Sequence, residues 1–312
     1  MRSYFLFIAS VFLLLSTSNV YSQDQFYIFS YFKGNGEDGL HLAYSNDGYH
    51  WEALKNDSSF LKPTVSKDRL MRDPCIIRGG DGRFHMVWTV SWTDRGIGYA
   101  SSADLIHWSE QQYLPVMAKE PDARNCWAPE ITYDDKTGTY MIYWATTIPG
   151  RFLETASAAE SSYNHRIYFL TTKDFKTFSD TRLLYDPGFN SIDATIVKDR
   201  GQFVMFLKDE TRQPPQKNIK IAYSAKLTGP YSPAGKPITG NYWAEGPTVL
   251  RLGKQWMVYF DKYIDHKYGA VASTDLKHWI DISDKINLPS GIRHGTIIQV
   301  TKDELAKLKE QD

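Results

Sequence analysis

Short apolar runs rich in β-branched and aromatic residues recur along almost the whole chain, separated by turns that contain Gly, Asp or Asn. Runs of this length flanked by such turns predict β-strands paired as hairpins. The clearest predicted hairpins span residues 76–89, 131–145, 196–207 and 249–260. A short polar helix is expected only in the tail, over residues 303–312.

A second unit also repeats. It consists of a strand, a turn rich in Ser, Thr and Asp, and an aromatic residue that closes the turn. Five copies are present, of which the fourth is the weakest: residues 40–51, 98–108, 168–178, 221–231 and 270–279. Self-similarity at a regular spacing is typical of repeat architectures.

An acidic residue stands shortly before each of these four hairpins: Asp73, Glu130, Asp193 and Glu245. A single acid before a strand is most simply a turn residue that bonds its own backbone. Here the pattern returns at intervals of roughly fifty to sixty residues, which favours one structural unit used repeatedly.

The repeats predict an all-β fold, a five-bladed β-propeller with about four strands in each blade. The fifth blade is split: the strands of residues 26–51 complete a blade that opens with residues 295–300. Such a closure hides the strand edges. Segments 146–166 and 209–218 are longer insertions, which are either functional rims or tolerated surface length.

The N-terminus has the pattern of a secretory signal peptide over residues 1–22. Arg2 precedes an apolar run at Tyr4–Leu15, and small polar residues end at Ser22. The apolar run is too short for a comfortable transmembrane helix. We therefore expect a single propeller over residues 23–312, exported to the periplasm or the extracellular space, with no membrane insertion.

Composition narrows the classes of partner. The chain has 312 residues, with 36 basic and 36 acidic side chains. A nucleic-acid surface normally needs a basic excess, so this class is excluded. Aromatic residues make up 14% of the chain, which suits either a large β core or stacking on sugar rings. Composition does not define an oligomeric state.

Two cysteines, Cys75 and Cys126, lie close to the acidic motifs. An exported protein can join such a pair in a disulfide. Two small buried thiols in neighbouring strands are the favoured alternative. Without histidines at matching spacing they do not make a zinc site.

The first strand of each propeller blade lines the central axis, so acids at the starts of these strands converge at one end of the channel. Like charges held close together cannot all stay ionised, and the pKa of at least one carboxyl should rise. A protonated acid beside an ionised base, placed across a scissile bond, is the requirement for glycoside hydrolysis.

Five motifs together closely resemble family-43 glycoside hydrolases, over essentially the whole expected mature chain: Arg72-Asp73-Pro74, Trp127-Ala128-Pro129-Glu130, Ile192-Asp193-Ala194, Glu245-Gly246-Pro247 and Arg293-His294-Gly295-Thr296. The specificity lies in their order and spacing. The resemblance implies a five-bladed propeller, hydrolysis with inversion, and α-L-arabinofuranosidase, β-xylosidase or arabinanase activity, with galactan-directed enzymes as a further group.

By motif, the resemblance implies that Asp73 is the general base and Glu245 the general acid. Asp193 corresponds to the third acid, which tunes and orients Glu245. Arg293 is a candidate for contact with a substrate hydroxyl, or else for a salt bridge to one of the acids.

His294 corresponds to a channel histidine that lies beside a bound calcium in some family members. Its alternative is a buried histidine held by hydrogen bonds, and no cofactor is required. Glu130 departs from the family pattern, where Asp is common, so it is interpreted as structural or substrate-contacting and not catalytic.

Four tryptophans are candidates for a sugar platform, although packing in the blades explains each equally well. Trp92 and Trp243 lie nearest to loop ends and are favoured over the other two, Trp127 and Trp144.

The leading hypothesis is an exported, exo-acting enzyme that removes terminal α-L-arabinofuranosyl or β-xylosyl residues from plant polysaccharides or oligosaccharides. A pocket closed by the 146–166 segment favours exo action, and an open cleft favours endo action. The alternatives are a galactan-directed glycosidase on the same fold and a carbohydrate-binding propeller without catalysis. A sucrose-type fructosidase fits the motif order less well.

Overall fold

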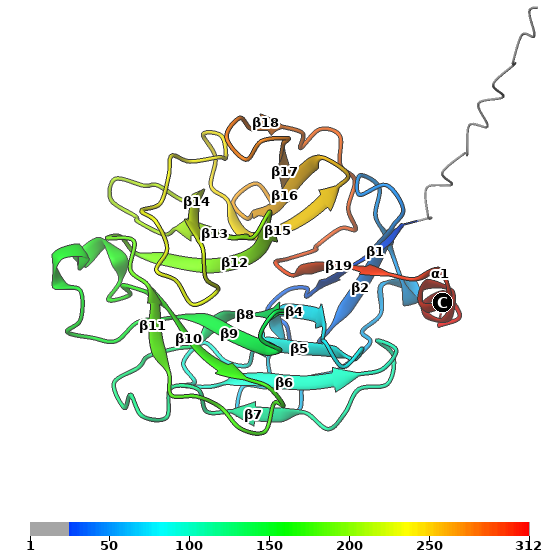
Figure 1. Ribbon diagram of the computed structural model, residues 1–312, viewed down its shortest axis with the longest axis horizontal. Helices are drawn as coiled ribbons and strands as arrows, with labels where there is room; N and C mark the ends of the chain where they lie inside the picture. The colour runs from blue at the N-terminus through cyan, green and yellow to red at the C-terminus, as the bar shows by residue number, and fades with distance from the viewer. Residues whose placement is uncertain (1–24, 312) are drawn as a thin grey trace, which may run out of the picture.

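Five antiparallel β-sheets stand around a central axis in the computed structural model, which describes residues 25–311 (Figure 1). The predicted all-β, five-bladed propeller is confirmed. The expected signal peptide lies outside the described residues. Within residues 25–311, no helix has the length and apolar character needed to cross a bilayer.

Each blade is a sheet whose first strand lies at the centre (Figure 1). The first blade holds β4 (Arg72–Arg78), β5 (Phe84–Thr89), β6 (Ile97–Ser102) and β7 (Gln112–Leu114). The second holds β8 (Trp127–Asp134), β9 (Thr139–Thr146), β10 (Arg166–Thr172) and β11 (Arg182–Tyr185). The third holds β12 (Ser191–Asp199), β13 (Gln202–Asp209) and β14 (Asn218–Ser224). The fourth holds β15 (Glu245–Leu252), β16 (Gln255–Lys262), β17 (Lys267–Ser273) and β18 (Ile280–Asp281).

The closing blade joins the two ends of the described chain. It contains β19 (Thr296–Val300), β1 (Phe26–Tyr31), β2 (His41–Ser45) and β3 (Glu52–Ala53). β1 pairs antiparallel with β19, with Ser30 opposite Thr296. The Ser30 hydroxyl also donates to the carbonyl of Pro74 at 2.7 Å, which ties this blade to the first one. The predicted split blade is confirmed.

The helices within residues 25–311 are few and short. One α-helix, α1 (Lys302–Lys309), forms the predicted polar tail and starts with a capping box built from Thr301 and Glu304. The 3-10 helices are η1 (Lys55–Asp57), η2 (Leu153–Thr155) and η3 (Ala158–Glu160).

The third blade departs from the expected four strands because its outer position has no regular strand. Residues 232–238 still run beside β14, where the amides of Ser232, Gly235 and Ile238 donate to β14 carbonyls. Prolines at positions 233 and 237 interrupt this segment. Proline has no amide hydrogen and cannot complete a ladder, which explains why no regular strand forms here.

The repeated turn has a common hydrogen-bond pattern. In the first blade, Oδ1 of Asp104 accepts from the amides of Ile106 and His107 at 2.9 and 2.8 Å, and the Ser102 hydroxyl accepts from Leu105. The equivalent carboxylates that hold three of the other four turns are Asp47, Asp174 and Asp275. The Ser/Thr/Asp content of the repeat is therefore explained by backbone amides that need acceptors.

The apolar core lies between neighbouring blades. The cluster between the first and second blades includes Cys75, Cys126 and Trp144. Both thiols are buried and free. This confirms the interpretation as small buried side chains, and burial raises the pKa of Cys75 well above its ordinary value.

Candidate active site

The four innermost strands β4, β8, β12 and β15 share one irregularity near their start. In each, two residues of the inner strand lie opposite a single residue of the next strand, which is a β-bulge. The first bulged residue has a positive φ of 45–59° in every case: Asp73, Ala128, Asp193 and Gly246. Left-handed backbone costs about 1–3 kcal/mol at residues other than glycine, and such strain is common at functional sites.

The bulges align the blades and show that the four acids do not occupy equivalent positions. Asp73 and Asp193 are themselves the first bulged residues. Glu245 stands one residue before its bulge, and Glu130 two residues beyond the equivalent Ala128. The expected convergence of acids at the strand starts therefore holds for Asp73, Asp193 and Glu245, whose charges act on one another. Glu130 lies further along its strand, because side-chain position depends on bulge register, which the sequence spacing conceals.

Asp73 and His294 form the centre of the cluster. One Asp73 oxygen lies 3.4 Å from Nδ1 of His294, and the other accepts from the Thr89 hydroxyl at 2.8 Å. Burial raises the pKa of Asp73, but His294, Arg72 and Thr89 outweigh it, and the net pKa is lowered. Burial lowers the pKa of His294, yet the carboxylates around it raise the value to about 9. An imidazolium beside a carboxylate is the expected state at neutral pH.

Asp193 is buried and bonded to the next blade, because its Oδ2 accepts from the Gly246 amide at 3.0 Å. Burial raises the pKa of Asp193 to about 6, a rise that Glu245 enhances and His294 opposes. Gly246 is required at this position, since an added Cβ would lie 2.4 Å from the His294 ring. The bulge at Gly246 therefore contacts both Asp193 and His294.

Two cations hold Glu245. Its Oε1 accepts from Nη2 of Arg293 at 3.1 Å, and its Oε2 accepts from Nζ of Lys208 at 2.9 Å. Arg293 also pairs through Nε with Asp261, the residue opposite Glu245 in the ladder. Burial raises the pKa of Asp261 to about 6 despite this pairing. The predicted salt bridge between Arg293 and one of the acids is present.

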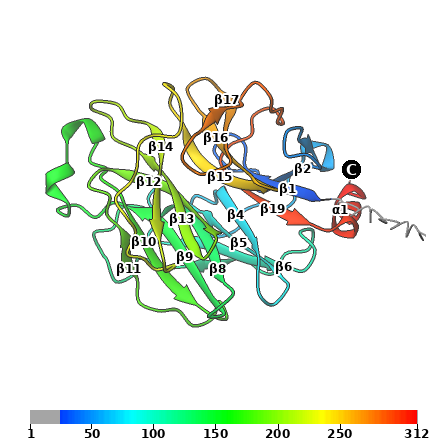
Figure 2. The same cartoon turned by 45° about the horizontal axis from the view of Figure 1, so that its top comes forward.

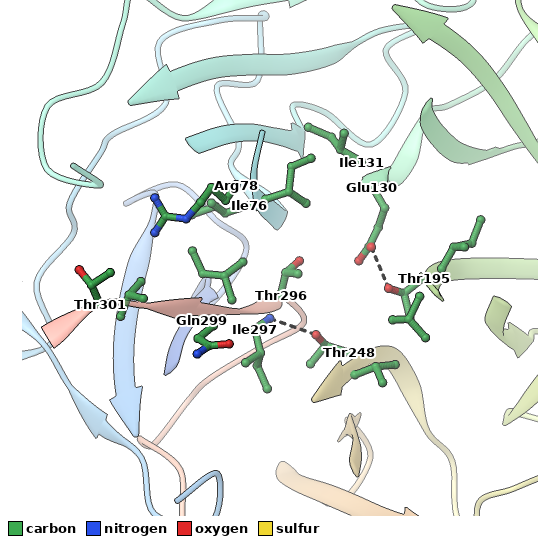
Figure 3. Close-up of a pocket in the computed structure, with 16 residues that line it drawn as sticks. Ile76, Arg78, Glu130, Ile131, Thr195, Thr248, Thr296, Ile297, Gln299 and Thr301 are labelled. Atoms are coloured by element: carbon green, nitrogen blue, oxygen red, sulfur yellow. Dashed lines mark hydrogen bonds between the residues drawn. The ribbon is translucent and has the colours of Figure 1, made fainter. Parts of the chain in front are cut away.

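Glu130 faces a different part of the channel. It lines a cavity of about 530 Å³ together with Thr195, Thr248 and Thr296, and is only 4% exposed (Figure 3). Its Oε2 accepts from the Thr195 hydroxyl at 2.8 Å and from Tyr143 at 3.4 Å. Burial raises the pKa of Glu130 to about 7, although the His294 charge opposes the rise. These contacts support its structural interpretation, and contact with substrate stays a prediction.

The predicted rise in carboxyl pKa is therefore confirmed at Asp193 and Glu130. The chain also matches a known protein family over most of its length. A model of a family-43-related type, described as a probable glycosyl hydrolase domain, matches residues 24–306. The chain belongs to this family 43-related group of glycosyl hydrolases.

Two curated relatives of this chain are named as glycosidases. An α-L-arabinofuranosidase from Bifidobacterium longum is 24% identical over 251 residues, covering 67% of this chain and 23% of the relative. An arabinan endo-1,5-α-L-arabinosidase A from Aspergillus clavatus, itself named as probable, is 26% identical over 204 residues, covering 62% of this chain and 59% of the relative. The chain thus spans less than two thirds of either relative.

Among solved structures, an exo-β-1,3-galactanase from Phanerochaete chrysosporium superposes with a TM-score of 0.54 at 13% identity. The match covers 72% of this chain and 53% of that chain. At this identity the likeness concerns the fold alone.

The four candidate tryptophans of this family 43-related protein differ in exposure. Trp92 and Trp243 are 44% and 40% exposed, whereas Trp144 is buried at 1%. Arg72 lies over the Trp92 ring at 4.3 Å, and Asn35 accepts from its indole N–H at 3.0 Å. Trp127 is half-buried against Tyr163 and His165 and donates to the Trp92 carbonyl. The core interpretation holds for Trp144, and Trp92 and Trp243 remain the candidates for a platform.

Replacing Trp92 by Ala should raise KM about three- to tenfold with little change in Tm, since a stacking contact contributes about 0.5–1.5 kcal/mol. Replacing the buried Trp144 should instead lower the free energy of unfolding by about 3–5 kcal/mol. Steady-state kinetics and thermal unfolding of both variants distinguish the two cases. An unchanged KM for Trp92→Ala would remove it from the platform.

The donor set around His294 lends no support to the calcium that the family resemblance suggested. No group of three or more metal-ligating side chains occurs within residues 25–311. Nδ1 of the buried His294 instead faces an oxygen of Asp73 at 3.4 Å. We therefore derive no step through a metal ion.

Three residues of the site carry no clear signal in the sequence: Lys208, Asp261 and Thr89. Each stands on the second strand of a blade, opposite the residue before the bulge, as Lys208 does opposite Ile192. Only the hairpin register places them beside the acids. A search for polar residues opposite each motif, with the bulge allowed for, could have found them.

Proposed function

We propose that this protein is an inverting, exo-acting glycoside hydrolase that removes terminal α-L-arabinofuranosyl or β-xylosyl residues from plant oligosaccharides or polysaccharides. The observation that carries the proposal is a cluster of three acids: Asp73 and Asp193 lie around His294, and Glu245 lies close enough to Asp193 to raise its pKa. Membership of a family 43-related group and a relative named as an arabinofuranosidase support it.

Asp73 suits the role of general base. Its lowered pKa keeps it ionised at neutral pH, and its side chain is 13% exposed, so water can approach it. In the proposed reaction Asp73 takes a proton from water as that water attacks the anomeric carbon.

Glu245 suits the role of general acid. Its side chain is 21% exposed and comes from a different blade than Asp73, as the two groups of an inverting enzyme must approach the sugar from opposite faces. It passes a proton to the glycosidic oxygen while that bond breaks. Asp193 lies beside Glu245, and burial together with the Glu245 charge raises the pKa of Asp193 to about 6.

The segment between β9 and β10 supports exo action. It projects beyond the sheets in both views and carries η2 and η3 (Figures 1 and 2). Its buried Glu160 accepts from the side chain of Asn190 and from the amide of Arg212, each at 2.7 Å, which fixes the segment over the loops of the third blade. A fixed rim can close one end of a substrate site.

Export belongs to the proposal as well. The sequence pattern of residues 1–22 supports secretion, which would bring the enzyme to plant polysaccharides outside the cytoplasm. A galactan-directed enzyme is the second candidate, because the galactanase structure shares the fold.

The test is a release assay with aryl α-L-arabinofuranoside, aryl β-xyloside and aryl β-galactoside, with the wild type beside Glu245→Gln. The wild type should cleave one pentoside, and the variant should lose about 10²- to 10⁴-fold on an unactivated substrate. Proton NMR of the first product anomer reports inversion.

Cleavage of the aryl β-galactoside alone would contradict the pentosidase proposal and favour the galactan-directed enzyme. Failure to cleave any of the three, with retained binding of oligosaccharides, would favour the non-catalytic propeller.

A further inference from the structure

Lys208 lies deep in the site and belongs to a chain of alternating charges. Its Nζ lies 2.9 Å from Oε2 of Glu245 and 2.6 Å from Oε2 of Glu210. Glu210 in turn lies 2.5 Å from Nζ of Lys217, which also donates to the Glu210 carbonyl at 2.7 Å. The Lys208 and Lys217 side chains are only 1% and 2% exposed.

Such a network is costly to build. Each buried ion loses its hydration, and the attraction between partners repays this only with close geometry. A purely structural network would stabilise the turn between β13 and β14 without reaching the acid proposed to donate the proton. This one ends on Glu245, with both oxygens of Glu210 held by lysines.

The two cations on Glu245 differ in their freedom. Lys208 is enclosed, and Glu210 and Glu245 hold its pKa well above the ordinary value against the effect of burial. Arg293 is 32% exposed and has Asp261 as a second partner, so it can leave Oε1 and keep an ion pair.

We propose that Lys208 is a positioning residue that fixes Oε2 of Glu245, so that Oε1 is the oxygen that passes the proton to the leaving group. This inference rests on the proposed function. The proton moves from Oε1 to the glycosidic oxygen as the carbon–oxygen bond breaks, and water supplies the new hydroxyl while its proton goes to Asp73. Glu210 and Lys217 hold Lys208 in place for this step.

Leaving groups separate a positioning role from a structural one. A 2,4-dinitrophenyl leaving group departs without a proton, whereas a sugar or methyl alcohol needs one. Lys208→Met removes the charge and keeps the length of the side chain. On the disaccharide or methyl glycoside, kcat should fall about 10- to 100-fold, because a misplaced group loses that much. On the dinitrophenyl glycoside it should stay within about threefold of wild type.

The matched control is Lys220→Met. Lys220 lies on β14 and pairs with the buried Asp209 at 2.7 Å, without contact to Glu245. Lys220→Met should change kcat on both substrates by the same small factor.

Glu210→Gln keeps the charge of Lys208 and serves as the second variant if Lys208→Met does not fold. Glu210→Gln should show the same difference between the two leaving groups, with a smaller loss of kcat. Equal losses on both substrates would overturn the positioning role. A wild type that cleaves no glycoside would instead overturn the proposed function, so the two failures are distinguishable.

Discussion

Asp73→Asn should lower kcat on the preferred glycoside by about 10²- to 10⁴-fold, with KM little changed. The asparagine oxygen can still accept from Thr89, so the bulge keeps this contact, but the amide cannot take a proton from water. The loss should be as large on a dinitrophenyl glycoside as on a disaccharide, because attack by water is needed for both. Steady-state kinetics on the two substrates measure this.

Asp81→Asn is the matched control. Asp81 lies in the β4–β5 turn of the same blade and contacts His85. This variant should keep full activity. The acidic limb of kcat/KM offers a second test, because a base with a lowered pKa keeps the limb below the ordinary range of a carboxyl group. A limb near pH 6 that persists in Asp73→Asn would transfer the role of base to Asp193, whose pKa is raised to about 6.

The sequence was sufficient for the fold because each level of the pattern agreed. Alternating hydrophobic runs, Gly-containing turns and the Ser/Asp/aromatic repeat all indicated the same unit, and hydrogen bonds such as those of Asp104 explain the repeat physically. The fourth copy was the weakest in the sequence, and its blade is the one that lacks a regular outer strand. Local chemistry therefore predicted where the architecture would be irregular.

The site was only partly predictable. The inner-strand motifs identified Asp73, Asp193 and Glu245, but their levels depend on a bulge whose position the sequence does not mark. Glu130 looked equivalent to them and lies two residues further along the channel. Lys208 was invisible because its role arises from a cross-strand contact and from partners on a neighbouring loop. Long-range register decides such contacts, and it is the information that local patterns carry least.

His294→Leu should lower the free energy of unfolding at pH 7 by about 3–5 kcal/mol, because it leaves buried carboxyls without their central cation. His294 has a folded-state pKa of about 9, above its ordinary 6.5. Its contribution is therefore fully present below about pH 6.5 and is lost as pH rises through 9. Urea unfolding at pH 6, 7.5 and 10 should show the difference between wild type and variant shrinking toward pH 10.

A second substitution, Glu130→Gln, tests whether the charge of His294 is what balances the buried carboxyls. The folded pKa of Glu130, about 7, exceeds the ordinary 4.5, so ionising it costs stability as pH rises through that interval. Glu130→Gln should thus restore part of the stability of His294→Leu at pH 7.5 and little of it at pH 4.5. His165→Leu is the control: burial lowers the pKa of His165 to about 4, so its loss should be independent of pH from 7 to 10. If His294→Leu shows the same flat dependence, the imidazolium is not what balances the acids, and the channel must hold its charge by another arrangement.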